Sequence, residues 1–507
     1  MNTPETTAAA LAAWSRGRGD EALALLRDLG PAAADDPLAL QIWALALKGD
    51  GAHADALALL ERAVRIAPGD PQAHFNLAVT LQAIGELPRA IAHYQAALRL
   101  DPAQLGALNN LSDLYRRRGR AAEGWALMER YQAAGGSVAG LEIRLAKLAM
   151  DLRRFDEAEV WFTRAATHAP KDPAVAWEHA MLTLAREDFV RGWAGYEARL
   201  ASHGLDAIGI FGYAAPRWKG EKLRGKSLLL HREQGLGDTI MFARCFAPLA
   251  KQARQLHLAV HPQIARLMAF NVPEAKVWSS VTTAGTGRQP QQPWLQLAGA
   301  IDFQAPICSL GALNLAKGVP RIPAYLRADP DDIESWALRL DQLAPSPNGA
   351  RRIGLVLGTR QVRWSDDGLT NALRKTVTAS AVGTLAQARG IRWVALHDRE
   401  TAAMLADVPD LDIADPSPWI TDMADTAAII ENLDAVVTAD TAVAHLAGAM
   451  GKRVLLMLWW NPDWRWGVDR TDSYWYPNVE VFRQKSPGDW ASVLEAVAEA
   501  LGSNLRG

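Results

Sequence analysis

The chain has 507 residues, with 54 Lys and Arg against 56 Asp and Glu, a formal net charge of -2. This balance argues against nucleic acid or an anionic membrane as partner, because both attract a strongly basic protein. Cys245 and Cys308 lie far apart in apolar contexts, which predicts two small core residues rather than a disulfide framework or a cysteine metal site. We find no leader peptide and no apolar run approaching a membrane span, and therefore expect a cytoplasmic protein of two to four structural units.

Residues 1–205 are rich in Ala and Leu and repeat every 34 residues, which is the tetratricopeptide period. Each repeat is a pair of helices that cannot bury its apolar face alone, so we expect about six repeats stacked into an all-α superhelix with a concave groove. Markers of four kinds share the period: boundary residues Pro68, Pro102, Gly136 and Pro170; turn glycines Gly51, Gly85 and Gly119; small packing residues Ala56, Ala90 and Ala158; and larger residues Leu60, Tyr94 and Phe162.

Grooves of this kind usually hold a peptide or a partner protein. Asn76, Asn109 and Asn110 fall on first helices of repeats, where a side-chain amide can bind an extended peptide backbone through a donor and an acceptor. They are our candidates for a protein-binding groove. The alternatives are that these amides are solvated, or that the repeats only brace the rest of the chain or self-associate. The aromatic segment Glu187–Leu200 is interpreted as a last repeat that docks on the next domain.

From about residue 223 the pattern changes to apolar strands alternating with helices, which predicts parallel α/β structure. We expect two halves, residues 206–335 and 336–507, joined across Ala328–Ala350 and enclosing a cleft. The expected strands are 227–231, 256–260, 277–278, 353–357, 391–396, 434–438 and 454–458; the expected helices are 239–252, 262–270 and 441–450; and 283–293 is expected to be a loop.

The first of these strands is followed by a turn that contains Gln234, Gly235, Gly237 and Asp238. The glycines allow a backbone to approach a ligand and to take positive φ at little cost. Asp238 falls near a helix start at the carboxyl end of a strand, where open α/β sheets keep their sites. It is therefore the leading candidate for a general base. The alternative is that Asp238 only caps the helix.

A second turn, Asp440-Thr441-Ala-Val-Ala-His445, also joins a strand to a helix. Its backbone N–H groups, the Thr441 hydroxyl and the positive helix end suit a phosphate or diphosphate. Asp440 could instead cap the helix, and His445 could be a packed core residue. The aromatic run that ends in Trp464-Arg465-Trp466 could stack on a nucleobase, line a sugar pocket, or pack between the halves.

Together, these motifs resemble tetratricopeptide-linked bacterial glycosyltransferases. The resemblance rests on Gln234–Ile240, Asp425–Asp434, Asp440–Lys452, Pro462–Trp466 and Ser473–Pro477, and it covers essentially the whole chain. The catalytic part of that family is similar to the lipopolysaccharide heptosyltransferases and, more distantly, to protein O-GlcNAc transferase, and some members glycosylate flagellin.

The resemblance implies an inverting, metal-independent transferase with a GT-B fold of two Rossmann-like halves. It makes Asp238 the base, with Gln234, Gly235 and Gly237 in the acceptor-side loop, and it places a nucleotide-sugar on the second half. It implies no further cofactor, and it makes flagellin the preferred acceptor, bound by the repeats. The implied donor-binding residues are Gly358, Thr359, Arg360, Lys375, Asp440, Thr441, His445, Trp464 and Arg465.

One segment departs from the family. A Gly-Asn stretch and an Asp-Arg-x-Arg-Ser run usually follow the strand at 353–357, whereas residues 358–376 here lack both. Arg360, Arg363, Arg374 and Lys375 remain alternatives for the phosphate-binding cation. The departure leaves two other functions open, an adaptor with a non-catalytic transferase-like domain and an enzyme that acts on a glycan or lipid acceptor.

Overall fold

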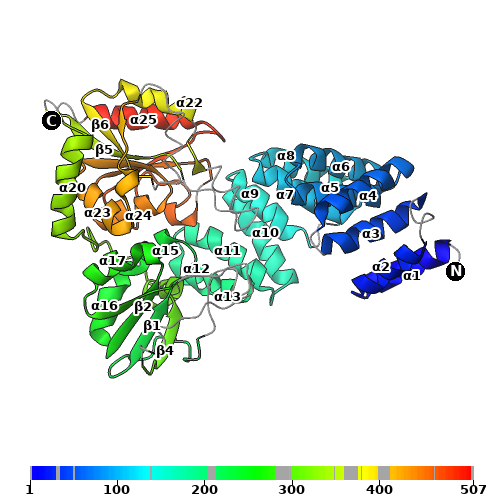
Figure 1. Cartoon of the computed structure of the whole chain (residues 1–507), viewed down its shortest axis with the longest axis horizontal. Helices are drawn as coiled ribbons and strands as arrows, with labels where there is room; N and C mark the ends of the chain where they lie inside the picture. The colour runs from blue at the N-terminus through cyan, green and yellow to red at the C-terminus, as the bar shows by residue number, and fades with distance from the viewer. Residues whose placement is uncertain are drawn as a thin grey trace. The chain divides into compact units, whose positions relative to one another are not determined.

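The computed structural model describes residues 3–29, 35–49, 52–137, 140–202, 213–280, 296, 299–346, 349–358, 375–377, 379–397, 411–461 and 463–503. The chain forms two compact units, Met1–Trp161 and Phe162–Gly507 (Figure 1). No helix in these ranges is both long enough and apolar enough to cross a membrane.

Within its described residues the first unit contains helices and no strands. Neighbouring helices pack in pairs, α1 with α2, α3 with α4, α5 with α6 and α7 with α8. The helices are α1 (Thr3–Ser15), α2 (Gly19–Leu29), α3 (Pro37–Gly49), α4 (His53–Ile66), α5 (Pro71–Ala83), α6 (Leu87–Leu100), α7 (Leu105–Arg117), α8 (Ala121–Ala133), α9 (Glu142–Asp151) and α10 (Phe155–His168), of which α10 continues into the second unit.

The 34-residue period is confirmed by the backbone. The turn glycines Gly85 and Gly119 have positive φ, of 86° and 74°. The same conformation recurs 34 and 68 residues after Gly119, at Arg153 (φ 59°) and Glu187 (φ 65°), although neither is glycine. Gly51 lies outside the described residues. The small packing residues are fully buried, as expected where two helices approach closely: Ala22, Ala56, Ala90 and Ala158.

The second unit begins with helices α11 (Pro173–Ala185), α12 (Phe189–Tyr196) and α13 (Arg199–Ser202) and continues into a parallel sheet of order β3-β2-β1-β4. The strands are β1 (Ser227–His231), β2 (Gln255–Val260), β3 (Ala275–Ser279) and β4 (Phe303–Pro306), and the helices that follow them include α15 (Leu236–Phe242), α16 (Phe246–Gln252), α17 (Pro262–Asn271) and α19 (Leu310–Asn314). The loop expected at 283–293 lies outside the described residues.

A second parallel sheet has the order β10-β9-β8-β5-β6-β7. Its strands are β5 (Arg351–Val356), β6 (Ile391–Ala395), β7 (Ile413–Ala414), β8 (Ala435–Ala439), β9 (Val454–Leu458) and β10 (Val479–Arg483). Its helices are α22 (Ala379–Val382), α23 (Met423–Glu431), α24 (Ala442–Ala449) and α25 (Trp490–Ser503). Figure 1 shows α25 on one face of this sheet and α23 and α24 on the other.

All seven expected strands are present, but β4, β7 and β10 were missed. The strand β7 has two residues, and β4 has four and ends in proline, so neither gives a readable periodic pattern. The segment Ala328–Ala350, expected only as a connection, contains helix α20 (Pro330–Leu343). Its Asp and Pro are a helix start: Asp329 accepts a hydrogen bond from the N–H of Asp331, and Pro330 occupies the first turn.

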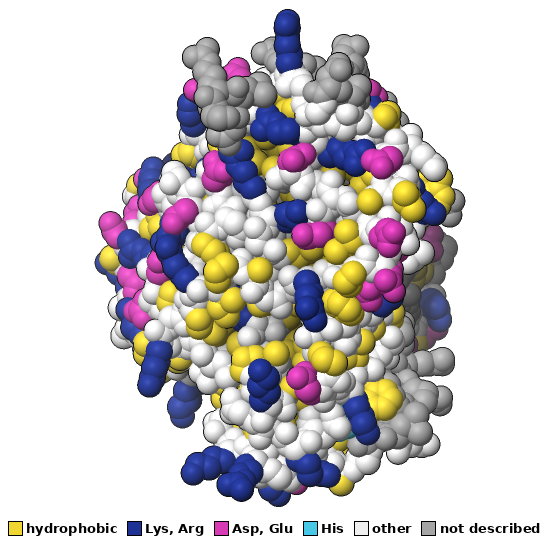
Figure 2. All heavy atoms as spheres, turned by 90° about the vertical axis from the view of Figure 1, so that its left-hand side faces the viewer, with side chains coloured by type: hydrophobic (Ala, Val, Ile, Leu, Met, Phe, Trp, Pro, Cys, Tyr) yellow, Lys and Arg dark blue, Asp and Glu magenta, His cyan; other side chains and the backbone are white. Residues whose placement is uncertain are grey.

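One continuous apolar core links both sheets with α11 and α12. Trp193 of α12 is 1% exposed and packs edge-to-face against Trp464 and Trp475 of the second sheet's connections. A Cβ at Gly311 would lie 2.3 Å from the Trp193 ring, so glycine lets α19 approach α12. The segment Glu187–Leu200 therefore docks on the α/β part, as expected. On the face of the molecule in Figure 2, basic and acidic side chains are interspersed.

Candidate functional site

In the six-stranded sheet the chain runs outward from β5 to β7 and then returns to build β8, β9 and β10 on the other side of β5. The point where the order reverses, between β5 and β8, is where open α/β sheets bind ligands beyond the carboxyl ends of their strands. Gly358 follows β5, and Asp440 directly follows β8. Two of the candidate donor-binding positions are thus brought to this point, while Thr359 and Arg360 lie outside the described residues.

Asp440 is buried at this switch point and has two polar partners. The Lys375 ammonium forms an ion pair with its Oδ2. The indole N–H of Trp466 donates to its Oδ1 at 2.8 Å. Burial opposes ionisation of Asp440 more than any other single effect does. The Lys375 charge, His445 and the hydrogen bonds from Lys375 and Trp466 together outweigh burial and hold the pKa of this carboxyl below its usual range. Among the four cations considered for phosphate, the structure describes Lys375, and it lies at the switch point.

Thr441, not Asp440, caps helix α24. The Thr441 Oγ1 accepts a hydrogen bond from the N–H of Val443 at 3.2 Å. The alternative that Asp440 caps the helix is therefore wrong, because the Asp440 carboxylate is directed to Lys375 and Trp466 instead.

His445 lies one turn into α24 and is 4% exposed. Its Nδ1 lies 2.9 Å from the Tyr476 hydroxyl, and its ring stacks on Trp466 at 5.0 Å between centroids. Burial lowers the pKa of His445 to about 4. The imidazole is therefore neutral at pH 7 and is packed as a core residue beside the candidate phosphate turn.

This burial predicts a pH dependence of stability. An unfolded histidine takes up a proton below pH 6.5, whereas His445 in the folded chain stays neutral down to about pH 4. Its contribution is therefore fully present above pH 6.5 and is lost as the pH falls toward 4. We expect His445→Gln to reduce the slope of the unfolding free energy against pH in this window by up to about 1.4 kcal/mol per pH unit. Chemical denaturation checks this, with exposed His168→Gln as control; an unchanged slope in His445→Gln would contradict it.

The turn after β1 differs from expectation in its backbone. Gln234 has a positive φ of 56°. Gly235 has a φ of -93°, and the φ of Gly237 is not positive either. The expectation that these two glycines supply a left-handed turn is wrong. The amide of Gln234 donates to the Tyr196 hydroxyl at 2.9 Å, which ties the turn to α12.

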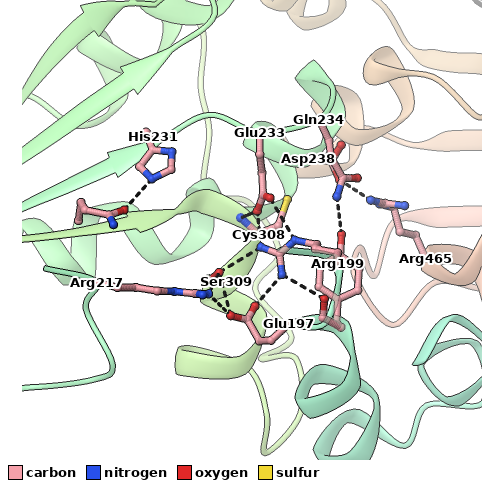
Figure 3. Close-up of polar contacts among 12 residues, drawn as sticks. Glu197, Arg199, Arg217, His231, Glu233, Gln234, Asp238, Cys308, Ser309 and Arg465 are labelled. Carbon is pink, nitrogen blue, oxygen red and sulfur yellow. Dashed lines mark hydrogen bonds and ion pairs between the residues drawn. The ribbon is translucent and has the colours of Figure 1, made fainter. Parts of the chain in front are cut away.

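Asp238 caps its helix and also forms an ion pair with the second half. Its Oδ2 accepts the N–H of Gly235 at 3.1 Å, and its Oδ1 binds the Arg465 guanidinium (Figure 3). Arg465 also binds Asp463 at 2.6 Å. The candidate base and a candidate donor-binding residue, expected on different halves, are thus in direct contact. Burial acts against the charge of Arg465, but Asp238 and Asp463 raise its pKa above the ordinary value.

Gly237 of α15 lies against His445 of α24, and only a residue without a side chain fits at this position. A Cβ there would lie 2.8 Å from Cδ2 of His445. The ring has little freedom to yield, because it is stacked on Trp466.

We expect Gly237→Ala to destabilise the fold by about 1–3 kcal/mol through overpacking. This exceeds the helix-propensity gain of at most about 1 kcal/mol. Gly502→Ala, at a helical glycine with open space around it, is the control. Equal melting temperatures for the two variants would contradict the close contact.

A buried ion pair that the sequence did not reveal fills the switch point of the first sheet, between β1 and β4 (Figure 3). Arg199 of α13 binds both oxygens of Glu233, at 3.0 and 2.6 Å, and both side chains are fully buried. Glu233 also accepts the N–H of Cys308 at 2.8 Å. Arg199 further binds Glu197 at 2.7 Å. The sequence gives little indication of the Arg199–Glu233 pair: Glu233 precedes the Gly turn, and Arg199 lies near the end of the docking segment Glu187–Leu200.

Trp464 and the two cysteines are packed in the core. Trp464 is 5% exposed and contacts Trp193 and Tyr196, with the Arg465 guanidinium over its ring at 4.4 Å. This arrangement supports the packing alternative for Trp464. Cys245 and Cys308 are both buried and unpaired by disulfide, as expected.

In the first unit the three candidate groove residues bind neighbouring side chains. Asn76 is 5% exposed, so the solvated alternative is wrong for it, and its amide donates to Gln41 at 3.0 Å. Asn109 accepts from Arg144 at 3.0 Å, and Asn110 donates to Tyr94 at 3.2 Å. A role of these amides in binding a partner stays a prediction.

Comparison with known proteins identifies the repeats. Two tetratricopeptide repeat family models match, at residues 47–95 and 75–139. Such repeats are protein-interaction modules. The chain is 28% identical to Protein FlbA of Caulobacter vibrioides over 358 residues, or 68% of this chain and 58% of FlbA. It thus spans little more than half the length of this curated relative.

Solved structures of repeat proteins also match in part. A tetratricopeptide repeat protein from Parabacteroides merdae is 19% identical with a TM-score of 0.35, covering 39% of this chain and 79% of that one. TTC0263, a tetratricopeptide protein from Thermus thermophilus, is 22% identical with a TM-score of 0.29, covering 36% and 98%.

Proposed function

We propose that the chain is an inverting glycosyltransferase that moves a sugar from a nucleotide-sugar to a Ser or Thr hydroxyl of a protein acceptor bound by the repeats. The observation that carries the proposal is the meeting of two loops from two parallel sheets. Asp238, after β1, touches Arg465, and Gly237 touches His445, one turn after the β8 switch point. A two-half GT-B transferase needs its acceptor-side base and its donor turn to converge in this way.

In the proposed reaction the diphosphate of the donor lies at the β5–β8 switch point. Lys375 and the N–H groups at the start of α24 bind it and stabilise the charge that develops on the leaving group. The acceptor oxygen attacks the anomeric carbon, the bond from that carbon to the phosphate oxygen breaks, and the acceptor proton passes to Asp238. The nucleoside diphosphate leaves with the bonding electron pair.

Arg465 has a part in this scheme because it now occupies one oxygen of Asp238. A donor phosphate near the switch point competes for the same guanidinium, which binds phosphate as readily as carboxylate. Donor binding would thereby free the Asp238 oxygen for the acceptor hydroxyl. The order of substrate binding follows, with the donor first.

Flagellin is the proposed acceptor, on the resemblance of the motifs alone, and the reaction is placed in the cytoplasm, where activated sugars are available. Titration of cytidine, uridine, adenosine and guanosine nucleotides against the purified chain tests the donor site. We expect one to bind and Lys375→Met to weaken it. Mass spectrometry of flagellin from a deletion strain tests the acceptor, and an unchanged glycoform would exclude flagellin while leaving the chemistry open.

An adaptor is the second candidate, and one observation favours it. Asp238 is 9% exposed, and both its oxygens are engaged, by Gly235 and Arg465. A transferase-like domain that no longer reacts would keep such contacts for stability. Failure of all four nucleotides to bind would favour the adaptor over the enzyme.

A further inference from the structure

The part of the chain that the structure describes contains four buried arginines, and one of them lacks an obvious counterpart. Arg199 and Arg465 bind carboxylates. Arg244 donates to three backbone carbonyls and lies over three aromatic rings. Arg232, 8% exposed, makes one hydrogen bond within the described residues, from Nη1 to the Ser280 carbonyl at 3.3 Å.

Arg232 occupies the carboxyl edge of the first sheet. It directly follows β1, and its backbone N–H donates to the Ala259 carbonyl of β2 at 2.8 Å. Ser280, whose carbonyl accepts the hydrogen bond from the Arg232 guanidinium, follows β3. Its N–H donates to the Val260 carbonyl at 2.8 Å. The guanidinium therefore crosses the ends of β2 and β3, at the point where His261 begins helix α17.

A guanidinium has five N–H donors, and a buried cation without an anion is unfavourable. Burial lowers the pKa of Arg232, whereas bound carboxylates raise that of Arg199 and Arg465. The fold thus holds a desolvated positive charge beside the N-terminus of a ten-residue helix, whose own first-turn N–H groups, from Gln263 and Ile264, already donate to His261. Such an arrangement is stabilised when an anion is supplied from outside.

His261 adds a neutral donor. Its Nδ1 accepts the N–H of Gln263 at 3.2 Å. Burial, and then the Arg232 charge, lower the pKa of His261 to about 4, so the ring is neutral at pH 7. Because Nδ1 is an acceptor, the single ring proton lies on Nε2, which is then a donor.

We propose that the Arg232 guanidinium and the Nε2–H of His261, at the start of α17, form a binding site for a carboxylate. The charge selects this ligand: the site offers one full positive charge, which a carboxylate balances, whereas a phosphate monoester would leave negative charge uncompensated. The planar guanidinium also matches a carboxylate with two parallel hydrogen bonds. If the proposed function is correct, the carboxylate belongs to the acceptor of the glycosyl transfer. Binding of a carboxylate at this site does not itself depend on the proposed function.

The test is thermal unfolding of the full chain with four organic probes and inorganic phosphate. N-acetylaspartate amide is paired with N-acetylasparagine amide, and glucuronate with glucose, so that the pairs separate an acidic side chain from a sugar acid. We expect at least one carboxylate probe to raise the melting temperature while its neutral partner does not. Arg232→Met should abolish this shift, and should melt no lower than wild type without probe, because an unpaired buried charge is removed. The exposed Arg224→Gln variant should keep the shift.

If Arg232→Met fails to fold, Arg232→Lys is used instead. Lysine keeps the charge but cannot make the two parallel hydrogen bonds of a guanidinium, so we expect at least a tenfold weaker affinity for the carboxylate probe. Three results would overturn the proposal: no shift with either carboxylate, a larger shift with phosphate, or an undiminished carboxylate shift in the Arg232 variants. Nucleotide titration of the same variants separates this site from the transferase. Wild-type nucleotide binding with no carboxylate shift would exclude the carboxylate site alone, whereas a carboxylate shift with no nucleotide binding would exclude the transferase alone.

Discussion

Asp238→Asn is expected to lower turnover of the proposed transfer by about 10²–10⁴-fold, the usual contribution of a positioned general base. The acceptor hydroxyl is a weak nucleophile, and an amide cannot take its proton. The amide oxygen can still accept the N–H of Gly235, which now binds Oδ2 at 3.1 Å, so the helix cap is kept. The measurement is single-turnover transfer to the acceptor, with nucleotide affinity determined in parallel and expected to be no weaker than wild type, because Arg465 is released from its pair with Asp238.

The ion pair with Arg465 gives this substitution a structural cost that must be separated from the chemical one. Breaking a buried pair typically costs about 3–5 kcal/mol of stability, and less is expected here because Arg465 keeps Asp463 at 2.6 Å. Arg465→Gln breaks the same pair and retains the Asp238 carboxylate, and it is compared at saturating donor because Arg465 also binds the donor phosphate in the proposed scheme. If both variants lost turnover only in proportion to stability, or if Asp238→Asn retained most of its turnover, Asp238 would not be the base.

Arg199→Met is expected to lower the free energy of unfolding by about 3–5 kcal/mol, because it leaves Glu233 charged and buried. Glu233 is 1% exposed and would keep the hydrogen bond from the N–H of Cys308 at 2.8 Å. Glu197, the second partner of Arg199, still has Arg217. Chemical denaturation with a probe for the second unit measures the loss.

The double variant Arg199→Met, Glu233→Leu distinguishes an unpaired charge from lost packing. Replacing both ends of a buried ion pair by apolar groups is often neutral or stabilising, so we expect it to recover most of the lost stability. A double variant as unstable as Arg199→Met would show that packing of the arginine stem dominates. Glu233 is also a poor candidate for an alternative base, because Arg199 and Cys308 occupy its oxygens.

Most of the strands that the sequence predicted contain apolar runs, and the same reasoning explains the failures. β1, β8 and β9 are buried along their whole length, so each contains adjacent apolar residues with no alternation of polar ones. The helix α20 was missed because its Asp and Pro were interpreted as a linker. The positive φ at Arg153 and Glu187 was not predicted either. The 34-residue period predicts a turn at these positions, but nothing in it indicates that a residue other than glycine adopts the left-handed conformation there.

The candidate site residues could be predicted from the sequence, but their interaction partners could not. Asp238, Asp440 and Thr441 were found because a strand followed by a small polar turn and a helix is a local pattern with a local meaning. Arg465, the partner of Asp238, lies 227 residues away from it, and Lys375 and Trp466, the partners of Asp440, lie 65 and 26 residues away from it. No periodicity connects such positions. The Asp238–Arg465 pair forms only when the two sheets pack together, whereas Asp440 meets Lys375 and Trp466 when the connections of the second sheet fold over its carboxyl edge.

The sequence by itself therefore determined the repeat period, the parallel α/β character and the two turns at which chemistry is proposed, since each depends on residues within one or two elements. The tertiary structure alone decided that Arg199 neutralises Glu233, that Arg465 binds Asp238, and that Gly237 allows His445 to approach. It also decided that Arg232 meets no carboxylate among the residues that the structure describes. The physical reason is that burial sets the energy of a charge, and burial is a property of the packed fold rather than of any local segment.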